Sequence, residues 1–163
     1  MLPGLTFVLG TAGSGKAGFA KTLVTGTGRG PVCILTAPAD DPAAQSSLAG
    51  RETDWTILRA PRDIGRTLAG ISGDSAVLLD ALPPWLDTLI ADGKDPAEAE
   101  AELMAGLALC AAPVIVLSCE PAPSDPPGLC AALSRLNLKL AAKAGLVVNV
   151  IAGLPQVLKG DLP

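Results

Sequence analysis

The chain has 163 residues but contains no histidine, no tyrosine and only two tryptophans and two phenylalanines. Histidine is the most frequent general base in enzymes and a frequent zinc ligand, so either kind of site would have to be built without it. The four cysteines show no C-x-x-C spacing, and a zinc site is therefore not indicated. We expect Cys33, Cys110, Cys119 and Cys130 to be small apolar core residues in a reducing compartment.

Clusters of positive charge are also missing. The 12 lysines and arginines are scattered among 16 acidic residues, and the resulting net charge of −4 argues against nucleic-acid binding. The uncharged stretch Leu103–Cys119 changes from helix-forming to β-branched residues at Pro113, which predicts a helix followed by a strand rather than a membrane span. No signal peptide is visible at the N-terminus, so we expect a cytoplasmic protein.

Short apolar runs alternate with helical stretches along the chain. The predicted strands are Leu5–Leu9, Val32–Thr36, Ala76–Leu79, Val114–Leu117 and Leu146–Ile151. The predicted helices are Lys16–Val24, Arg62–Ala69, Leu82–Ala91, Ala97–Ala111 and Pro127–Ala144, and the two long loops are Pro38–Glu52 and Glu120–Gly128. Strands that are apolar throughout are typical of a parallel sheet buried on both faces. We therefore expect one doubly wound α/β domain over residues 1–163, with a mostly parallel sheet between helices.

A glycine-rich segment follows the first predicted strand and matches most of the phosphate-loop pattern G-x-x-x-x-G-K-[ST]. In such a loop, backbone N–H groups surround phosphate oxygens and a lysine reaches the outer phosphates. The predicted nucleotide-binding residues here are Gly10, Thr11, Ala12, Gly13, Ser14, Gly15, Lys16 and Ala17. The segment also fits the dinucleotide pattern G-x-G-x-x-G from Gly13 to Gly18, or a plain glycine-rich turn. The phosphate loop is favoured because Gly10 directly follows the strand.

Residues beyond the other strands complete the predicted site, since ligands of such sheets bind past the carboxyl ends of the strands. Thr36, Ala37 and Pro38 are expected to line the nucleotide. Asp80 ends an apolar strand and is expected to hold Mg²⁺, directly or through water; the alternative is a solvated turn or a helix cap.

Ala17 occupies the position where a hydroxyl normally ligates Mg²⁺. Either a water replaces that ligand, or the site binds nucleotide but turns over poorly.

Glu120 follows the fourth predicted strand and is a candidate general base toward a substrate hydroxyl, or a second metal anchor. The alternative is a surface acid before a proline-rich loop. Lys16, Asp80 and Glu120 are thus the predicted catalytic residues. Trp55 and Trp85 are expected to be packing or lid residues rather than platforms that stack on a base.

The order of these segments resembles the adenosylcobinamide kinase/adenosylcobinamide-phosphate guanylyltransferase family of cobalamin biosynthesis. The resemblance covers most of the chain. Its segments are Phe7–Lys16, Trp55–Leu58, Ala76–Leu82, Val114–Glu120 and Leu136–Pro155, with Lys159 after them.

The resemblance implies a P-loop NTPase-like (RecA-like) fold, often assembled as a trimer. It also implies ATP or GTP as substrate with Mg²⁺, and phosphorylation of the aminopropanol hydroxyl of the corrinoid adenosylcobinamide. A second step would transfer GMP through a histidine in the segment that here spans Ala43–Trp55, and this chain has no histidine. Ala17 and Cys119 replace the family's serine and asparagine.

We therefore expect kinase chemistry at most. The first alternative is a nucleotide-binding paralogue that has lost catalysis and has a regulatory or assembly role. The second is a small-molecule kinase of unrelated substrate.

Overall fold

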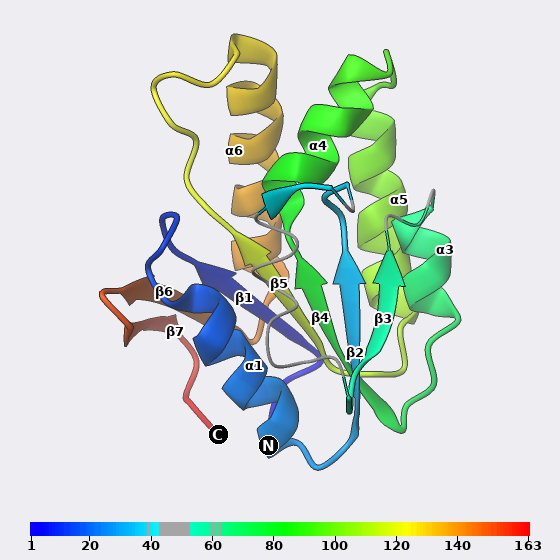
Figure 1. The fold of residues 1–163 in the computed structure, drawn as a ribbon, viewed down its shortest axis with the longest axis vertical. Helices are drawn as coiled ribbons and strands as arrows, with labels where there is room; N and C mark the ends of the chain where they lie inside the picture. The colour runs from blue at the N-terminus through cyan, green and yellow to red at the C-terminus, as the bar shows by residue number, and fades with distance from the viewer. Residues whose placement is uncertain (39, 43–52, 60, 62) are drawn as a thin grey trace.

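The structure, a computed structural model, describes residues 1–38, 40–42, 53–59, 61 and 63–163. In these residues a seven-stranded sheet has the order β3-β2-β4-β5-β1-β6-β7 (Figure 1). The strands are β1 Leu5–Leu9, β2 Gly30–Leu35, β3 Thr56–Arg59, β4 Ser75–Asp80, β5 Val114–Ser118, β6 Leu146–Ile151 and β7 Leu154–Lys159. All neighbours pair in parallel except β6 and β7, which form an antiparallel hairpin.

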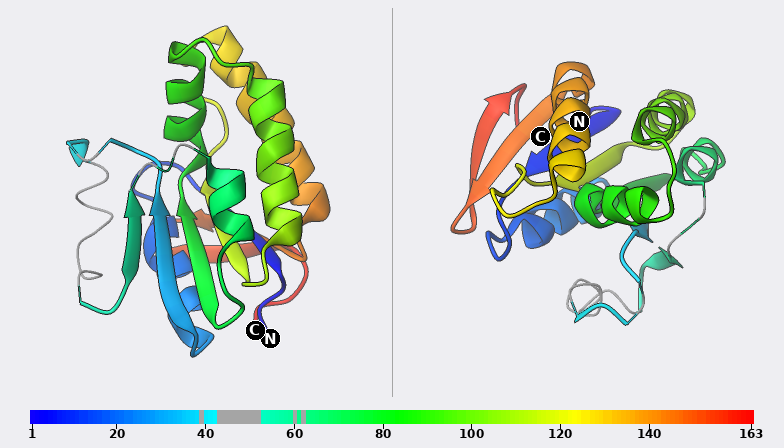
Figure 2. Two further views of the ribbon diagram at one scale, coloured as in Figure 1. Left: turned by 90° about the vertical axis from the view of Figure 1, so that its right-hand side faces the viewer. Right: turned by 90° about the horizontal axis from the view of Figure 1, so that it is seen from above.

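Helices cover both faces of this sheet. They are α1 Lys16–Gly26, α3 Ile64–Ala69, α4 Leu82–Ala91, α5 Pro96–Leu109 and α6 Pro127–Lys143. Among the described residues α1 lies on one face, and α3, α4, α5 and α6 lie on the other (Figure 2). No helix in this part of the chain is both long and apolar enough to cross a bilayer.

The sheet is buried on both sides, which explains its continuously apolar strands. In β1, Phe7 packs into the layer of four helices and the next residue, Val8, packs into the layer of α1. The same alternation occurs in β5, where Val116 and Leu117 point into opposite layers. Because successive strand residues face opposite sides, both must be apolar here, and this confirms the expected mostly parallel sheet.

The five predicted strands and five predicted helices are all present, with ends that shift by one or two residues. The second predicted helix, Arg62–Ala69, begins at Ile64 in the structure, where Asp63 accepts a hydrogen bond from the backbone N–H of Arg66 and caps α3. The sequence prediction missed β3 and β7. Both are edge strands; β7 is exposed along its whole length, so it carries no buried apolar run. The predicted loop 38–52 and helix start at 62 fall largely outside the described residues.

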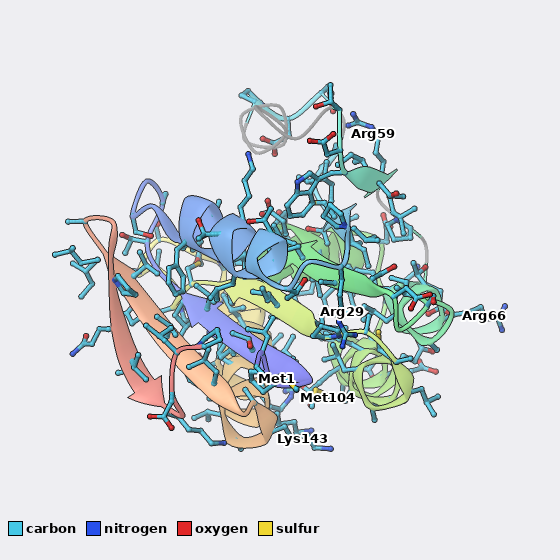
Figure 3. The ribbon with its side chains drawn as sticks, turned by 90° about the horizontal axis from the view of Figure 1, so that it is seen from below. Met1, Arg29, Arg59, Arg66, Met104 and Lys143 are labelled. Carbon is cyan, nitrogen blue, oxygen red and sulfur yellow. The ribbon has the colours of Figure 1, made fainter. Side chains whose placement is uncertain are left out.

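Figure 3 labels four cationic side chains of the described residues. Its labels place Arg29, Arg59, Arg66 and Lys143 apart from one another. They belong to the α1–β2 turn, the end of β3, α3 and the end of α6, respectively.

Two glycines let the backbones of α3 and α5 touch. A Cβ atom on Gly106 would lie 2.3 Å from the carbonyl oxygen of Gly65 and 2.4 Å from its Cα. A Cβ atom on Gly65 would lie 2.4 Å from the carbonyl oxygen of Glu102. All of these obstacles are backbone atoms, so a side chain at either position would force the helices apart.

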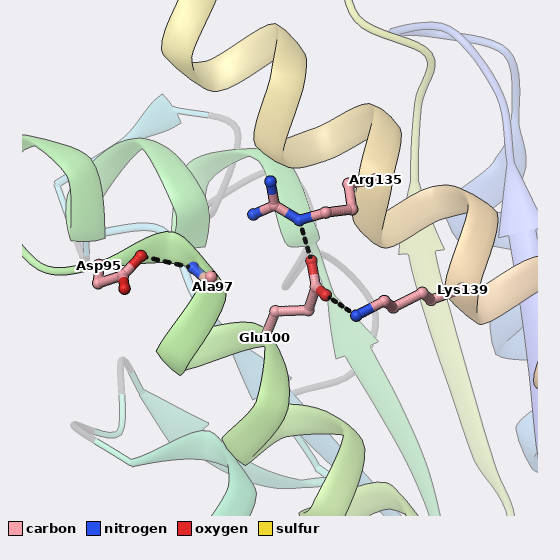
Figure 4. Close-up of polar contacts among 5 residues, drawn as sticks. All are labelled: Asp95, Ala97, Glu100, Arg135 and Lys139. Carbon is pink, nitrogen blue, oxygen red and sulfur yellow. Dashed lines mark hydrogen bonds and ion pairs between the residues drawn. The ribbon is translucent and has the colours of Figure 1, made fainter.

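Glu100 links α5 to α6 through a buried carboxylate (Figure 4). It accepts hydrogen bonds from Nε of Arg135, at 3.0 Å, and from Nζ of Lys139. Burial alone would raise the pKa of Glu100. The hydrogen bonds and positive charges of Lys139 and Arg135 outweigh that effect and hold the pKa below its ordinary value.

We predict that Gly106→Ala lowers the free energy of unfolding by about 1–3 kcal/mol, because the added methyl overpacks a contact between two backbones. Chemical denaturation measures this. Gly128→Ala is the matched control. Gly128 lies in α6, and a Cβ atom added to it would have no other atom within 4 Å. Equal stability of the two variants would contradict the helix contact described above.

We also predict that Glu100→Gln destabilises the protein by about 1–2 kcal/mol at neutral pH, because charge-assisted hydrogen bonds are lost. A carboxylate whose folded pKa is depressed stabilises above its ordinary pKa of 4.5, and this stabilisation disappears as the pH falls through the lower folded value. The difference in unfolding free energy between wild type and variant should therefore shrink in acid. The exposed Glu102→Gln serves as control; a difference that persists at low pH would argue against the ion pair.

Candidate functional site

The turn between β1 and α1 holds the predicted phosphate loop. Gly13 and Gly15 have φ values of 74° and 89°, which glycine adopts readily, and the N–H of Ser14 donates to the carbonyl of Thr11 at 3.1 Å. Gly15 is the N-cap of α1 and has no side chain that could satisfy the first N–H groups of the helix. Donors at such a helix start are well suited to an anion.

The β6–β7 turn packs directly against this loop. The N–H of Gly153 donates to the carbonyl of Ser14 at 2.7 Å. A Cβ atom on Gly15 would lie 3.1 Å from the Cα of Gly153, and one on Gly10 would lie 2.4 Å from Oγ of Ser14 and 3.0 Å from the carbonyl oxygen of Val150. Glycine suits both positions. Gly15 combines a positive φ with a close approach to Gly153, and a Cβ atom at Gly10 would crowd the Val150 carbonyl and displace the Ser14 side chain.

Lys16 is the first residue of α1, and its side chain folds back across the loop. Its ammonium donates to the carbonyl of Thr11 at 3.2 Å, and the side chain is only partly exposed. Its backbone N–H makes a longer contact, 3.4 Å, with Oγ of Ser14. A single turn of chain thus gathers glycine N–H groups and one ammonium.

The ends of β2 and β4 are tied together beside this loop. The N–H of Thr36 donates to the carbonyl of Asp80 at 3.0 Å, and Oγ1 of Thr36 accepts from the N–H of Ala81 at 3.0 Å and donates to the carbonyl of Ala81. Thr36 is buried, Ala37 is half-buried and Pro38 is exposed. Asp80, partly exposed, is the last residue of β4 rather than the first residue after it.

β5 lies between β4 and β1 in the sheet. The end of β5 therefore lies between Asp80, at the end of β4, and the phosphate loop that follows β1. Burial raises the pKa of the Cys119 thiol; the positive charge of Lys16 lowers it in part, while Asp125 and Glu120 raise it further. The charges of Lys16 and Glu120 therefore both act on the Cys119 thiol. Glu120 is an exposed residue and lies two positions beyond the end of β5.

Sequence reasoning missed two features that shape this edge. Asn137 of α6 hydrogen-bonds the end of β5, and Gly153 supports the phosphate loop. Asn137 interrupts a stripe of leucines in α6, which is a signal that sequence alone offers. No comparable signal marks Gly153, because its role depends on where the β6–β7 turn lies in space.

The remaining predicted residues differ in their surroundings. Ala17 packs against the core on the α1 side and has no side-chain oxygen to offer a metal. Trp55 is buried in the same layer, as the packing interpretation predicts. Among the described residues, no group of three or more histidine, cysteine or acidic side chains could hold a metal ion.

A cavity of about 420 Å³ lies between α3, α4 and α5 and includes Trp85 in its wall. Its polar lining is mainly acidic: Asp63, Asp95, Glu98 and Glu102, with Lys94. None of the predicted catalytic residues lines this cavity. The cavity therefore does not identify the catalytic centre.

Many solved structures resemble this fold, including the following two. One is an ATPase from the type III secretion system of pathogenic bacteria, with a TM-score of 0.55 and 12% identity over 94% of this chain and 56% of that chain. The other is the P4 protein of bacteriophage phi6, solved with ADP, with a TM-score of 0.52 and 15% identity over 93% of this chain and 53% of that chain. The chain thus spans about half the length of either structure. These likenesses confirm the P-loop NTPase-like fold class.

No curated protein sequence is a significant match to the chain. A family model does match, from residue 6 to residue 158, which is nearly the whole sequence. The model is CobU, described as cobinamide kinase / cobinamide phosphate guanyltransferase, and the chain therefore belongs to this family.

Proposed function

We propose that this protein binds a nucleoside triphosphate, ATP or GTP, in the loop Gly10–Ala17 and transfers its terminal phosphoryl group to the aminopropanol hydroxyl of cobinamide. The geometry of the loop carries the proposal. Gly13, Gly15 and the Lys16 ammonium lie in one turn at the start of a helix, where an anion is most favourably bound. Membership of a cobinamide kinase family supports the choice of acceptor.

Each residue of the proposed site has a defined role. The backbone N–H groups of Gly13 to Lys16 bind phosphate oxygens, and the ammonium of Lys16 neutralises charge on the transferred group. The carboxylate of Asp80 would hold a magnesium ion, directly or through water. Bound with the nucleotide, magnesium would neutralise charge on the phosphates. The donor set fits this ion, because Mg²⁺ usually keeps several waters and needs only one or two protein carboxylates.

Glu120 acts on the acceptor. Its exposed carboxylate takes the proton of the acceptor hydroxyl as the hydroxyl oxygen bonds to the terminal phosphorus. The bond between that phosphorus and the bridging oxygen breaks, and a nucleoside diphosphate leaves. Phosphoryl transfer depends mostly on positioning and electrostatics, so this small set of groups is sufficient.

The proposal stops at phosphoryl transfer. The guanyl transfer that the family resemblance implies proceeds through a histidine, and these 163 residues contain none. The resemblance puts that histidine in the segment Ala43–Trp55, of which residues 43–52 lie outside the described residues. We propose further that the chain is a single domain and forms a homo-oligomer, a trimer by family resemblance. We also propose that it is located in the cytoplasm and binds no nucleic acid.

A second candidate function is a nucleotide-binding paralogue with a regulatory or assembly role. Ala17 and Cys119 favour it, because both depart from the family pattern beside the phosphate loop. The deciding measurement is turnover with cobinamide and either nucleotide, with detection of the diphosphate and of phosphorylated cobinamide. Tight binding without turnover would support the paralogue, and turnover only with another alcohol would indicate an unrelated substrate.

We predict that Lys16→Ala weakens nucleotide binding by about 5- to 150-fold, equivalent to roughly 1–3 kcal/mol for a charge-assisted contact. Calorimetric titration measures the dissociation constant. Lys143→Ala is the control, because this exposed lysine lies in the last turn of α6, away from the loop. Unchanged affinity of Lys16→Ala would refute the phosphate-loop assignment.

We predict that Ala17→Ser strengthens nucleotide binding several-fold when Mg²⁺ is present and leaves it unchanged in EDTA. The new hydroxyl would supply the metal ligand that alanine lacks, worth on the order of 1 kcal/mol. Each protein serves as its own control through the comparison with and without metal. An equal effect in EDTA would mean that residue 17 does not face the ion.

A further inference from the structure

Asn137 is a buried polar residue in the middle of an apolar helix face. Only 5% of it is exposed, and its neighbours on that face, Leu133, Leu136 and Leu140, are completely buried. A buried amide is costly unless its hydrogen bonds are made. The catalytic steps described above do not use it, so its presence in α6 calls for another explanation.

The contacts of Asn137 lie at the end of β5. The hydroxyl of Ser118 donates to Oδ1 of Asn137 at 2.8 Å, and Nδ2 of Asn137 donates to the carbonyl of Cys119 at 2.9 Å. Ser118 is the last residue of β5 and Cys119 is the first residue beyond it. One side chain thus holds the point where the chain leaves the sheet.

That point determines where the next residue lies. Glu120 immediately follows Cys119 and is itself exposed, so the direction of its backbone depends on how Cys119 is fixed. The phosphate loop is close by, because Ser118 is paired in register with Leu9, the last residue of β1 before Gly10. The two hydrogen bonds that Asn137 makes therefore bear on the position of Glu120 relative to Lys16.

We propose that Asn137 is a positioning residue that fixes the end of β5 and thereby holds Glu120 in place beside the phosphate loop. The inference deepens the proposed function and rests on it for the role of Glu120. Asn137 does not touch the reacting atoms; it acts through the backbone of Cys119. Ser118 contributes through its hydroxyl, which restrains Oδ1 and leaves the amide group directed at that carbonyl.

The kinetic experiment uses Asn137→Leu, which keeps the helix face apolar and close in volume. We expect kcat for phosphoryl transfer to cobinamide to fall by about 10- to 100-fold, as for a displaced catalytic group, while the nucleotide dissociation constant changes less than about twofold. Ser118→Ala, which keeps the bond to Cys119, should lose less. Ala131→Gly, an exposed change that weakens the same helix, is the control for stability and should keep wild-type kcat.

A double-mutant cycle with Glu120→Gln tests whether Asn137 acts through Glu120. In the Glu120→Gln background, Asn137→Leu should reduce kcat by less than about twofold, because the group being positioned is already inactive. Losses that multiply in full would overturn the proposal.

A second readout does not depend on activity. The rate at which N-ethylmaleimide labels the Cys119 thiol should rise several-fold in Asn137→Leu, while labelling of Cys110, measured in the same chain by peptide mass, stays unchanged. Unchanged labelling of Cys119 would overturn the proposal. A wild type that binds nucleotide but transfers no phosphate would refute the proposed function instead, and the thiol rates would still show whether Asn137 holds this segment.

Discussion

The structure depends on close backbone contact between the glycine loop and the β6–β7 turn. The loop approaches the turn at the van der Waals limit, and the Gly153 N–H donates to Ser14 across that contact. A loop of glycines would otherwise have the greatest conformational freedom of any segment, and fixing it would oppose ligand binding. The sheet reduces that cost, since β1 and β6 are neighbouring parallel strands and bring the two turns together.

The same parallel arrangement gathers the rest of the candidate site. Strands β1, β5 and β4 are adjacent in that order, so the loop after β1, the chain after β5 and the last residue of β4 share one edge of the sheet. Lys16, Glu120 and Asp80 come from segments far apart in sequence, and the order of the parallel strands brings these segments to one edge. Polar side chains hold the strand ends: Thr36 joins β2 to β4, and Asn137 joins α6 to β5.

Much of the fold could be predicted because a strand that is buried on both faces is apolar at every position, and such runs are visible in the sequence. Runs such as 114–117 are apolar at every position, and α5 begins at a clear cap, Asp95 before Pro96. The edge strand β7 could not be found this way, because its residues are exposed and its pairing with β6 is a tertiary fact. The phosphate loop could be recognised as a sequence motif, whereas its contact with Gly153 depends on two turns that are distant in sequence and close in space. The roles of the site residues remain predictions.

The outer edge of β7 has a consequence for how this protein could interact with other protein chains. In the described residues this edge has no strand neighbour, and Leu154 and Leu158 are 72% and 56% exposed. Such an edge readily accepts an additional strand. A chain that paired with β7 there would restrain the β6–β7 hairpin, and the turn of this hairpin contacts Ser14 of the phosphate loop. By thermodynamic reciprocity, its affinity and that of an anion in the loop would then influence each other equally.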